Sequence, residues 1–150
     1  MTPRDLEQYL HEHIPLSKAM QVTVVARDPD RVVLSAPLAP NANPHETVFG
    51  GSISAAAMLA AWSLLHTRLT SSGLSASLVL KRNTMSYEAP ISGNFTATAS
   101  TPDTKAWEAF TRMLAQRGRA RITVPVVIEY RGRVAGRFEG EFVALGTTRT

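Results

Sequence analysis

The feature that most constrains the fold of this chain is a long stretch without a charged side chain, which lies between Glu46 and Arg68. It opens on Gly50 and Gly51, and residues 52–65 are then apolar almost all round at helical spacing. A helix of this kind is enclosed on most sides rather than amphipathic. It is nearly long enough to span a membrane, but its alanines, its serines and the strand patterns around it favour burial within a domain. We therefore expect one long buried helix at the centre of the fold.

The rest of the chain predicts a sheet around this helix. Alternating apolar and polar residues, typical of half-buried strands, recur on both sides of it. The expected strands are residues 21–27, 31–36, 75–87, 94–100, 119–130 and 134–145. Short turns join several of them, which favours an antiparallel arrangement. Two further helices are expected, at residues 3–13 and after Asp103. The predicted fold class is α+β, with a curved antiparallel sheet wrapped around one long central helix.

Composition narrows the classes of function. The 150 residues are expected to form a single domain over residues 1–150. The absence of cysteine excludes a disulfide framework, a thiolate nucleophile and a Cys-ligated metal. His45 and Glu46 are adjacent, but no second pair completes a set of ligands, so no metal is expected. The first residues carry charges of both signs and no apolar run, which argues against a signal peptide and favours a cytoplasmic location.

The charge of the chain indicates an anionic partner. The formal net charge is +4, and the basic residues are scattered apart from a cluster of Arg117, Arg119 and Arg121. A basic surface attracts a nucleotide-bearing molecule, a nucleic acid or a phospholipid. No basic stripe is interleaved with aromatic residues, so a nucleic acid is not expected as partner. A membrane is not expected as partner either. The arginine cluster could meet a phosphate, or it could be an ordinary solvated helix end.

The start of the long helix is where we expect the chemistry. Gly50 and Gly51 would expose free backbone N–H groups, with the positive end of the helix dipole behind them. Such an end binds anions or the developing oxyanion of an acyl carbonyl. Glycine also lets a substrate approach the backbone closely. The alternative is that the two glycines only allow a tight turn before a crowded helix.

The loop before the helix supplies two candidate polar residues. His45 is the only histidine in this loop and could act as a general base near the helix start, or it could simply face solvent. Asn43 could orient a water molecule or a thioester carbonyl, or it could organise an Asx turn before Pro44. The glycines do not form a nucleophile elbow, which needs Gly-x-Ser-x-Gly. No Walker A lysine follows them either.

Several motifs of the chain resemble those of one known family. They are Pro40-Asn41-x-Asn43, then Thr47-x-Phe49-Gly50-Gly51-Ser52, then an Ala/Leu helix that reaches Trp62, with Tyr87–Pro90 at the end of a long strand and Gly118–Ile122 at the start of another. Together they look like the thioesterase domain at the C-terminus of YiiD-type acetyltransferases. The resemblance covers nearly the whole chain, and this sequence would be a version without the acetyltransferase domain.

The resemblance implies a hotdog fold and a homodimer, which often pairs again into a tetramer. It implies acyl thioesters of coenzyme A or of acyl carrier protein as substrates, so that coenzyme A enters only as part of the substrate. The acyl carbonyl would lie at the N-terminus of the central helix. In PaaI-like hotdog thioesterases an Asn precedes a His-Gly-Gly motif. Here Asn43 stands at the matching spacing, and Phe49 replaces that His.

One position departs from the pattern of these relatives. They carry an Asp or Glu on the central helix, seven residues after the second Gly, and this place is Met58 here. The carboxylate that would act as nucleophile or base is therefore absent. Either His45 or Glu46 substitutes for it, or Asn43 and a polarised carbonyl suffice at a lower rate, or the protein binds thioesters without hydrolysing them.

The prediction from the sequence is a hotdog-fold acyl thioesterase. The N–H of Gly51 would polarise the thioester carbonyl, while Asn43 or His45 positions the attacking water and His45 accepts its proton. The expected substrate-binding residues are Phe49, Gly50 and Ser52 around the acyl group, and Arg82 and Arg121 for the phosphates of coenzyme A. Two alternatives stay open, namely a non-catalytic acyl-CoA-binding protein and a structural partner protein.

Overall fold

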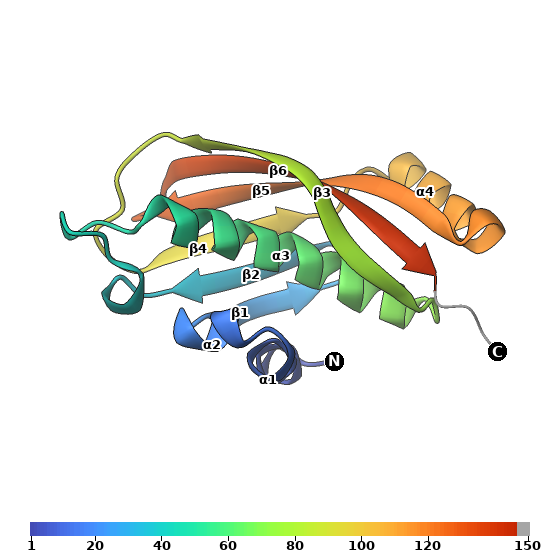
Figure 1. Cartoon of the computed structure of the whole chain (residues 1–150), viewed down its shortest axis with the longest axis horizontal. Coiled ribbons are helices and arrows are strands. Elements are labelled where there is room, and N and C mark those ends of the chain that lie inside the picture. The colour runs from blue at the N-terminus through green and yellow to red at the C-terminus, as the bar shows by residue number, and fades with distance from the viewer. Residues whose placement is uncertain (147–150) are drawn as a thin grey trace.

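A six-stranded antiparallel sheet curves around one long helix in this protein (Figure 1). The computed structural model describes residues 1–146. The long helix is α3 (Gly50–Ser71). The strands are β1 (Thr23–Asp28), β2 (Arg31–Ala36), β3 (Ala76–Tyr87), β4 (Phe95–Ser100), β5 (Arg119–Tyr130) and β6 (Arg133–Gly146). Their order across the sheet is β1-β2-β4-β5-β6-β3, which leaves β3 at one edge. The predicted hotdog architecture is confirmed.

Small side chains allow α3 to lie close against the sheet. Ala57, Ala60 and Ala61 have no exposed surface, and Phe138 and Phe142 of β6 are buried with them in one core. Alanine fills little space, so the large rings of the sheet can pack against the helix backbone. Among residues 1–146, no helix combines the length and the apolar character that crossing a membrane requires. The apolar stretch is therefore the core of the domain, as expected.

The shorter helices agree with the sequence less completely. Helix α1 (Pro3–His13) was predicted, and Thr2 caps it with a capping box. Helix α4 (Thr104–Arg117) was also predicted, and Asp103 caps it. Helix α2 (Pro15–Ala19) was not predicted, because Pro15 suggested only the end of a helix, whereas proline also fits the first helical position. A short 3₁₀ turn, η1 (Ala39–Asn41), was missed as well.

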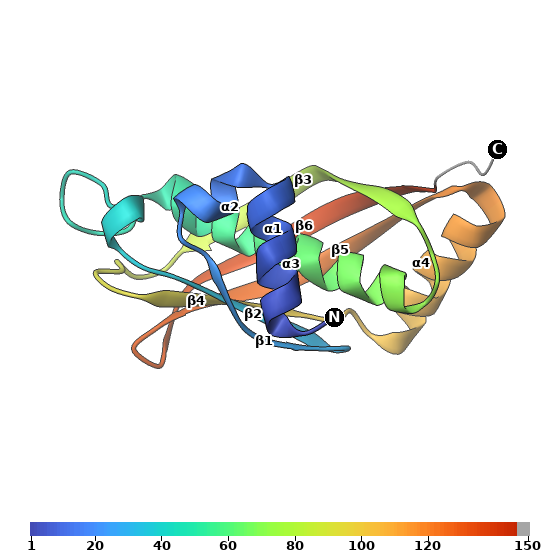
Figure 2. The ribbon, with the colours of Figure 1, turned by 90° about the horizontal axis from the view of Figure 1, so that it is seen from below.

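Helix α1 crosses the outer side of α3 (Figure 2). Stacked aromatic rings connect the two helices. The ring of Tyr9 lies 4.8 Å from that of His66 and 6.2 Å from that of Trp62, between centroids. His66 also stacks on Trp62 at 4.7 Å, and His13 lies against Tyr9 at 4.2 Å. Burial lowers the pKa of His66 below its ordinary value of 6.5, and the nearby charge of His13 acts in the same direction. His66 is therefore held neutral within the stack.

The stability of the protein is expected to fall in mild acid because of His66. The unfolded chain takes up a proton at His66 below pH 6.5, whereas the folded chain resists it until a lower pH. The contribution is therefore fully present above pH 6.5 and is lost as the pH falls through the lowered pKa. Urea unfolding of wild type and His66→Phe between pH 5 and 7.5 measures it, since phenylalanine preserves the stack without titrating. A pH dependence in His66→Phe equal to that of wild type would contradict the assignment.

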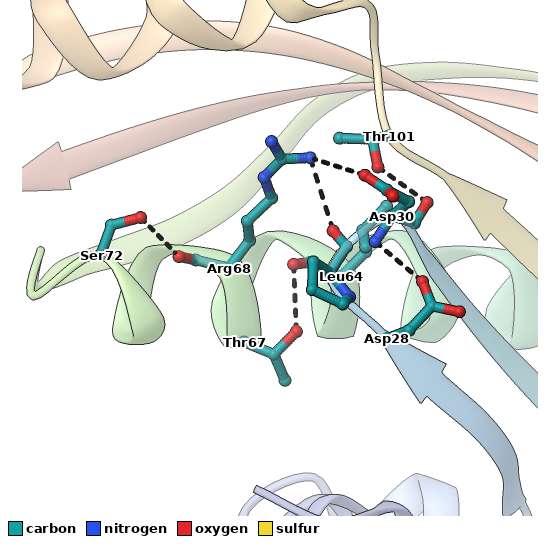
Figure 3. A network of polar contacts seen from close by, with 8 residues as sticks. Asp28, Asp30, Leu64, Thr67, Arg68, Ser72 and Thr101 are labelled. Atoms are coloured by element: carbon teal, nitrogen blue, oxygen red, sulfur yellow. Dashed lines mark hydrogen bonds and ion pairs between the residues drawn. The ribbon is translucent and has the colours of Figure 1, made fainter.

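The C-terminal end of α3 contacts the β1–β2 turn and the segment around the start of α4 (Figure 3). Arg68 donates from Nη1 to the carbonyl oxygen of Pro29 at 3.4 Å and forms an ion pair with Asp30 at 3.8 Å. Its guanidinium also lies over the ring of Trp107 in α4, 4.4 Å from the centroid. Thr101 donates from Oγ1 to the carbonyl oxygen of Asp30 at 2.7 Å. These contacts fix the β1–β2 turn and α4 against the C-terminal end of α3.

Candidate functional site

The N-terminus of α3 presents unused backbone donors. The first two residues of the helix are Gly50 and Gly51, and the residue before them, Phe49, provides no side-chain cap. The N–H groups of Ser52 and Ile53 donate to the carbonyl oxygen of Phe49, at 2.9 and 3.2 Å. Those of Gly50 and Gly51 find no acceptor among the described residues. The first turn carries no acidic residue, so the positive end of the helix dipole is not compensated there.

The ring of Phe49 lies directly over this helix start. Phe49 is 58 % exposed, and a Cβ atom built on Gly51 would collide with its ring. Gly51 itself is exposed. The glycine therefore leaves room for an aromatic ring that covers the helix start from the solvent side.

A network of main-chain bonds fixes the position of the helix start. The N–H of Phe49 donates to the carbonyl oxygen of Asn41 at 2.7 Å, and that of Val48 donates to Ile91 at 2.8 Å. The hydroxyl of Tyr87, at the end of β3, donates to the carbonyl oxygen of Gly50 at 3.1 Å. Beside this contact lies a hollow of about 330 Å³, lined by Val48, Gly50, Ile53, Tyr87, Glu88, Ala89, Pro90 and Ile91. The helix start thus opens on a small pocket with an apolar lining.

Tyr87 was not predicted as a site residue, although it belongs to the Tyr87–Pro90 motif of the family resemblance. The strand pattern that predicted β3 gives no sign that its last residue bonds to Gly50, since the two residues are far apart in the chain. The sequence signal for this contact is a tyrosine at the end of a predicted strand, immediately before a turn that contains proline.

Asn43 organises the loop that precedes the helix. Its Nδ2 donates to Oγ1 of Thr47 at 2.7 Å. Its Oδ1 accepts from the backbone N–H groups of His45 and Thr47, at 2.8 and 3.2 Å. Both acceptor sites of the amide oxygen are therefore occupied, and one Nδ2 hydrogen remains. The Asx turn, one of the two roles left open by the sequence, is observed, and a direct role in catalysis remains a prediction.

His45 and Glu46 lie on the exposed part of the same loop. A bridge between Ala42 and Val48 closes the loop, so His45 stands near its tip, beyond the segment that leads into α3. Its side chain makes no hydrogen bond among the described residues. Glu46 adopts a positive φ of 64°, which fits the tight turn. The structure thus leaves the imidazole of His45 available to a ligand, on a loop rather than in a pocket.

The structure does not bring the two predicted phosphate-binding arginines to the start of α3. Arg121 lies between Ala120 and Ile122, which are buried in the core, so it points to the opposite face of the sheet. Arg82 pairs with Glu141 across the β3–β6 ladder, and Arg121 forms an ion pair with Glu141 at 3.6 Å. These three side chains share the outer face of the sheet. Ser52, in contrast, is half-buried in the first turn of α3.

Comparisons with known proteins agree with this architecture. Residues 3–146 match the model of a family described as “Putative thioesterase (yiiD_Cterm)”. A protein of unknown function from Chlorobaculum tepidum TLS superposes with a TM-score of 0.91 at 28% identity, over 97% of this chain and 98% of that one. A “putative thioesterase” from Shewanella oneidensis superposes with a TM-score of 0.84 at 28% identity, over 95% and 96%. A “Probable Thioesterase” from Pseudomonas aeruginosa has the same fold, with a TM-score of 0.82 at 20% identity over 97% of each chain.

Proposed function

This chain belongs to the yiiD_Cterm thioesterase family, and on that premise we propose that it hydrolyses acyl thioesters at the N-terminus of α3. The observation that carries the proposal is the pair of unused N–H groups of Gly50 and Gly51 at an exposed helix start. Such donors stabilise the negative charge that develops on a carbonyl oxygen during acyl transfer. Removal of one donor of this kind typically costs about 10²- to 10³-fold in turnover.

The proposed reaction assigns a role to groups at the helix start and on the loop before it. The thioester oxygen accepts a hydrogen bond from the N–H of Gly51. A water molecule attacks the carbonyl carbon while His45 takes its proton, and the remaining Nδ2 hydrogen of Asn43 helps to orient that water. The C–S bond then breaks, and the thiolate leaves and takes up a proton. The products are a carboxylic acid and a thiol, and Phe49 and Ser52 border the acyl group.

A second candidate function is the binding of acyl thioesters without turnover. One specific observation favours it. Met58, a half-buried apolar residue, occupies the helix position that carries a carboxylate in PaaI-like relatives. Without that carboxylate, hydrolysis depends on the exposed His45 and on the polarised carbonyl.

Release of free thiol from a panel of acyl-CoAs tests the proposal. The panel covers short, long and aromatic acyl groups, together with an acyl carrier protein thioester, and compares wild type with His45→Ala. Turnover that falls sharply in the variant supports hydrolysis with His45 as the base. Turnover that is unchanged supports hydrolysis with the chemistry confined to the helix start. Tight binding without turnover would contradict hydrolysis and favour the binding protein.

Asn43→Ala is expected to lower both turnover and stability, because it removes three hydrogen bonds that shape the loop. Loss of part-buried bonds of this kind costs about 1–2 kcal/mol of unfolding free energy. Asn43→Asp separates the two roles, since a carboxylate still accepts from the N–H groups of His45 and Thr47, and can accept from the Thr47 hydroxyl in place of the Nδ2 bond, but has no Nδ2 hydrogen. If the remaining hydrogen orients the water, Asn43→Asp should keep the melting temperature near that of wild type and lose at least about tenfold in turnover. Full turnover in Asn43→Asp would restrict Asn43 to the turn.

We further propose that the protein acts as a homodimer or a dimer of dimers. Strand β3 has a single neighbour in the sheet, β6, and its twelve residues leave the other edge open (Figure 1). An open edge of this length is a template for pairing with a second strand. Light scattering is expected to give a mass near two or four times 16.3 kDa. A monomer at micromolar concentration would contradict the proposal.

A further inference from the structure

A groove of about 1050 Å³ lies between α4 and the strands β5, β6 and β3. One wall is formed by Ala106, Ala109 and Met113, which recur at helical spacing along one side of α4. The other side is formed by the outer face of β5, including Arg119 and Arg121. Figure 1 shows α4 at the end of the molecule opposite to the start of α3. None of the residues that line the groove belongs to α3 or to the loop before it, so the groove is separate from the start of α3 in the same protomer.

Positive charge is in excess within this groove. Its charged lining residues are Lys81, Arg117, Arg119, Arg121 and Glu141. The one carboxylate of this set, Glu141, is shared by Arg121 at 3.6 Å and Lys81 at 4.0 Å. Neither Arg117 nor Arg119 forms an ion pair among residues 1–146. The groove therefore attracts an anion with more than one negative charge.

The α4 side of the groove is apolar along Ala106, Ala109 and Met113, with Arg117 at the C-terminal end of the same helix. The side chains of Ala106 and Ala109 are small and leave the space of the groove open, and Met113 is exposed at its rim. A thioether makes favourable contacts with aromatic rings. The planar guanidinium group of arginine can donate two parallel hydrogen bonds to the oxygen atoms of a phosphate. A ligand that combines a planar ring with phosphate groups would use both sides of the groove, whereas a simple anion would use only one.

We propose that the groove between α4 and β5 binds a phosphorylated nucleotide. The ring lies against Ala109 and Met113, and the phosphates lie against Arg117, Arg119 and Arg121. Two sources share this chemistry, namely a free nucleotide and the nucleotide end of coenzyme A. Only the second rests on the proposed hydrolysis of acyl-CoA. Because the groove is separate from the start of α3 in its own protomer, binding can be measured without turnover.

Isothermal titration of the whole protein tests the proposal. The ligands are adenosine 3′,5′-bisphosphate, ADP, coenzyme A and inorganic pyrophosphate. The Arg117→Gln/Arg119→Gln double variant should weaken nucleotide binding at least about tenfold, because each arginine supplies charge-assisted hydrogen bonds. Ala109→Leu fills the apolar side and should weaken it by a similar factor. The matched controls are Arg133→Gln, at the far end of the β5–β6 hairpin, and Ala115→Leu, an exposed position of α4 outside the groove. Both should bind as wild type does.

Each outcome decides a specific point. Tighter binding of coenzyme A and the bisphosphate than of ADP supports the coenzyme as the source, and equal binding of ADP supports a free nucleotide. Pyrophosphate binding as tight as that of the nucleotides, no binding at all, or binding that neither groove variant weakens would each overturn the proposal. Hydrolysis is assayed separately with an acyl thioester of N-acetylcysteamine, which has no nucleotide. Failure of that reaction would contradict the proposed function and leave the binding result unaffected.

Discussion

Gly51→Ala is expected to lower the turnover of acyl thioesters at least about tenfold while the protein remains as stable as wild type or becomes more stable. Gly51 has no positive φ, so alanine fits its backbone, and alanine favours a helix over glycine by up to about 1 kcal/mol. The new methyl group, however, collides with the ring of Phe49 and occupies the exposed face over which the thioester would approach. Steady-state thiol release and urea unfolding of the same samples measure the two effects.

The double variant Phe49→Ala/Gly51→Ala identifies the cause of the loss. It removes the ring with which the methyl group collides, so that only the methyl group itself remains at the helix start. If displacement of Phe49 blocks the site, turnover should recover in the double variant. If the methyl group keeps the carbonyl away from the N–H groups, turnover should stay low. Wild-type turnover in Gly51→Ala would show that the substrate does not bind at the start of α3.

The fold was predictable because its main signals are local. The stretch without charged residues in α3 is stable only when it is buried. The alternation of apolar and polar residues determines which side chains of each strand face the helix. Asp103 and Gly118 mark the two ends of α4 by side-chain capping and a left-handed backbone. These features depend on residues close together in the chain. Pro15 is the exception, since a proline both follows α1 and begins α2.

The site was predictable only in part, because its contacts join distant segments. The glycines at the start of α3 and the loop before them are read directly from the sequence. Whether the Asn43 side chain shapes the turn or contacts a ligand depends on the position of Thr47. The hydrogen bond from Tyr87 to Gly50 depends on where β3 lies in the sheet. Likewise, the groove beside α4 exists because the helix packs across β5. Periodicity shows which face of an element is apolar, but not which neighbour will cover it.

The largest expected effect on stability is that of Phe138→Ala, which should lower the unfolding free energy by about 3–5 kcal/mol. Phe138 is buried on the inner face of β6, and its neighbour on that face, Gly140, has no side chain that could fill the vacated space. For a domain of this size the loss is a large share of a total of about 5–15 kcal/mol. Urea unfolding measures it, and Leu145→Ala, at an exposed position of the same strand, is the control that should change little.

A second substitution, at Gly140, tests whether the effects of positions 138 and 140 on the unfolding free energy depend on each other. A Cβ atom at position 140 would lie 2.7 Å from the ring of Phe138 and 3.0 Å from that of Phe142, so Gly140→Ala alone should cost about 1–3 kcal/mol. In the Phe138→Ala background, the closest of these contacts disappears and the methyl group partly fills the cavity. The double variant should therefore be more stable than the sum of the two single changes predicts. Strict additivity would mean that the two residues do not share one space beneath α3.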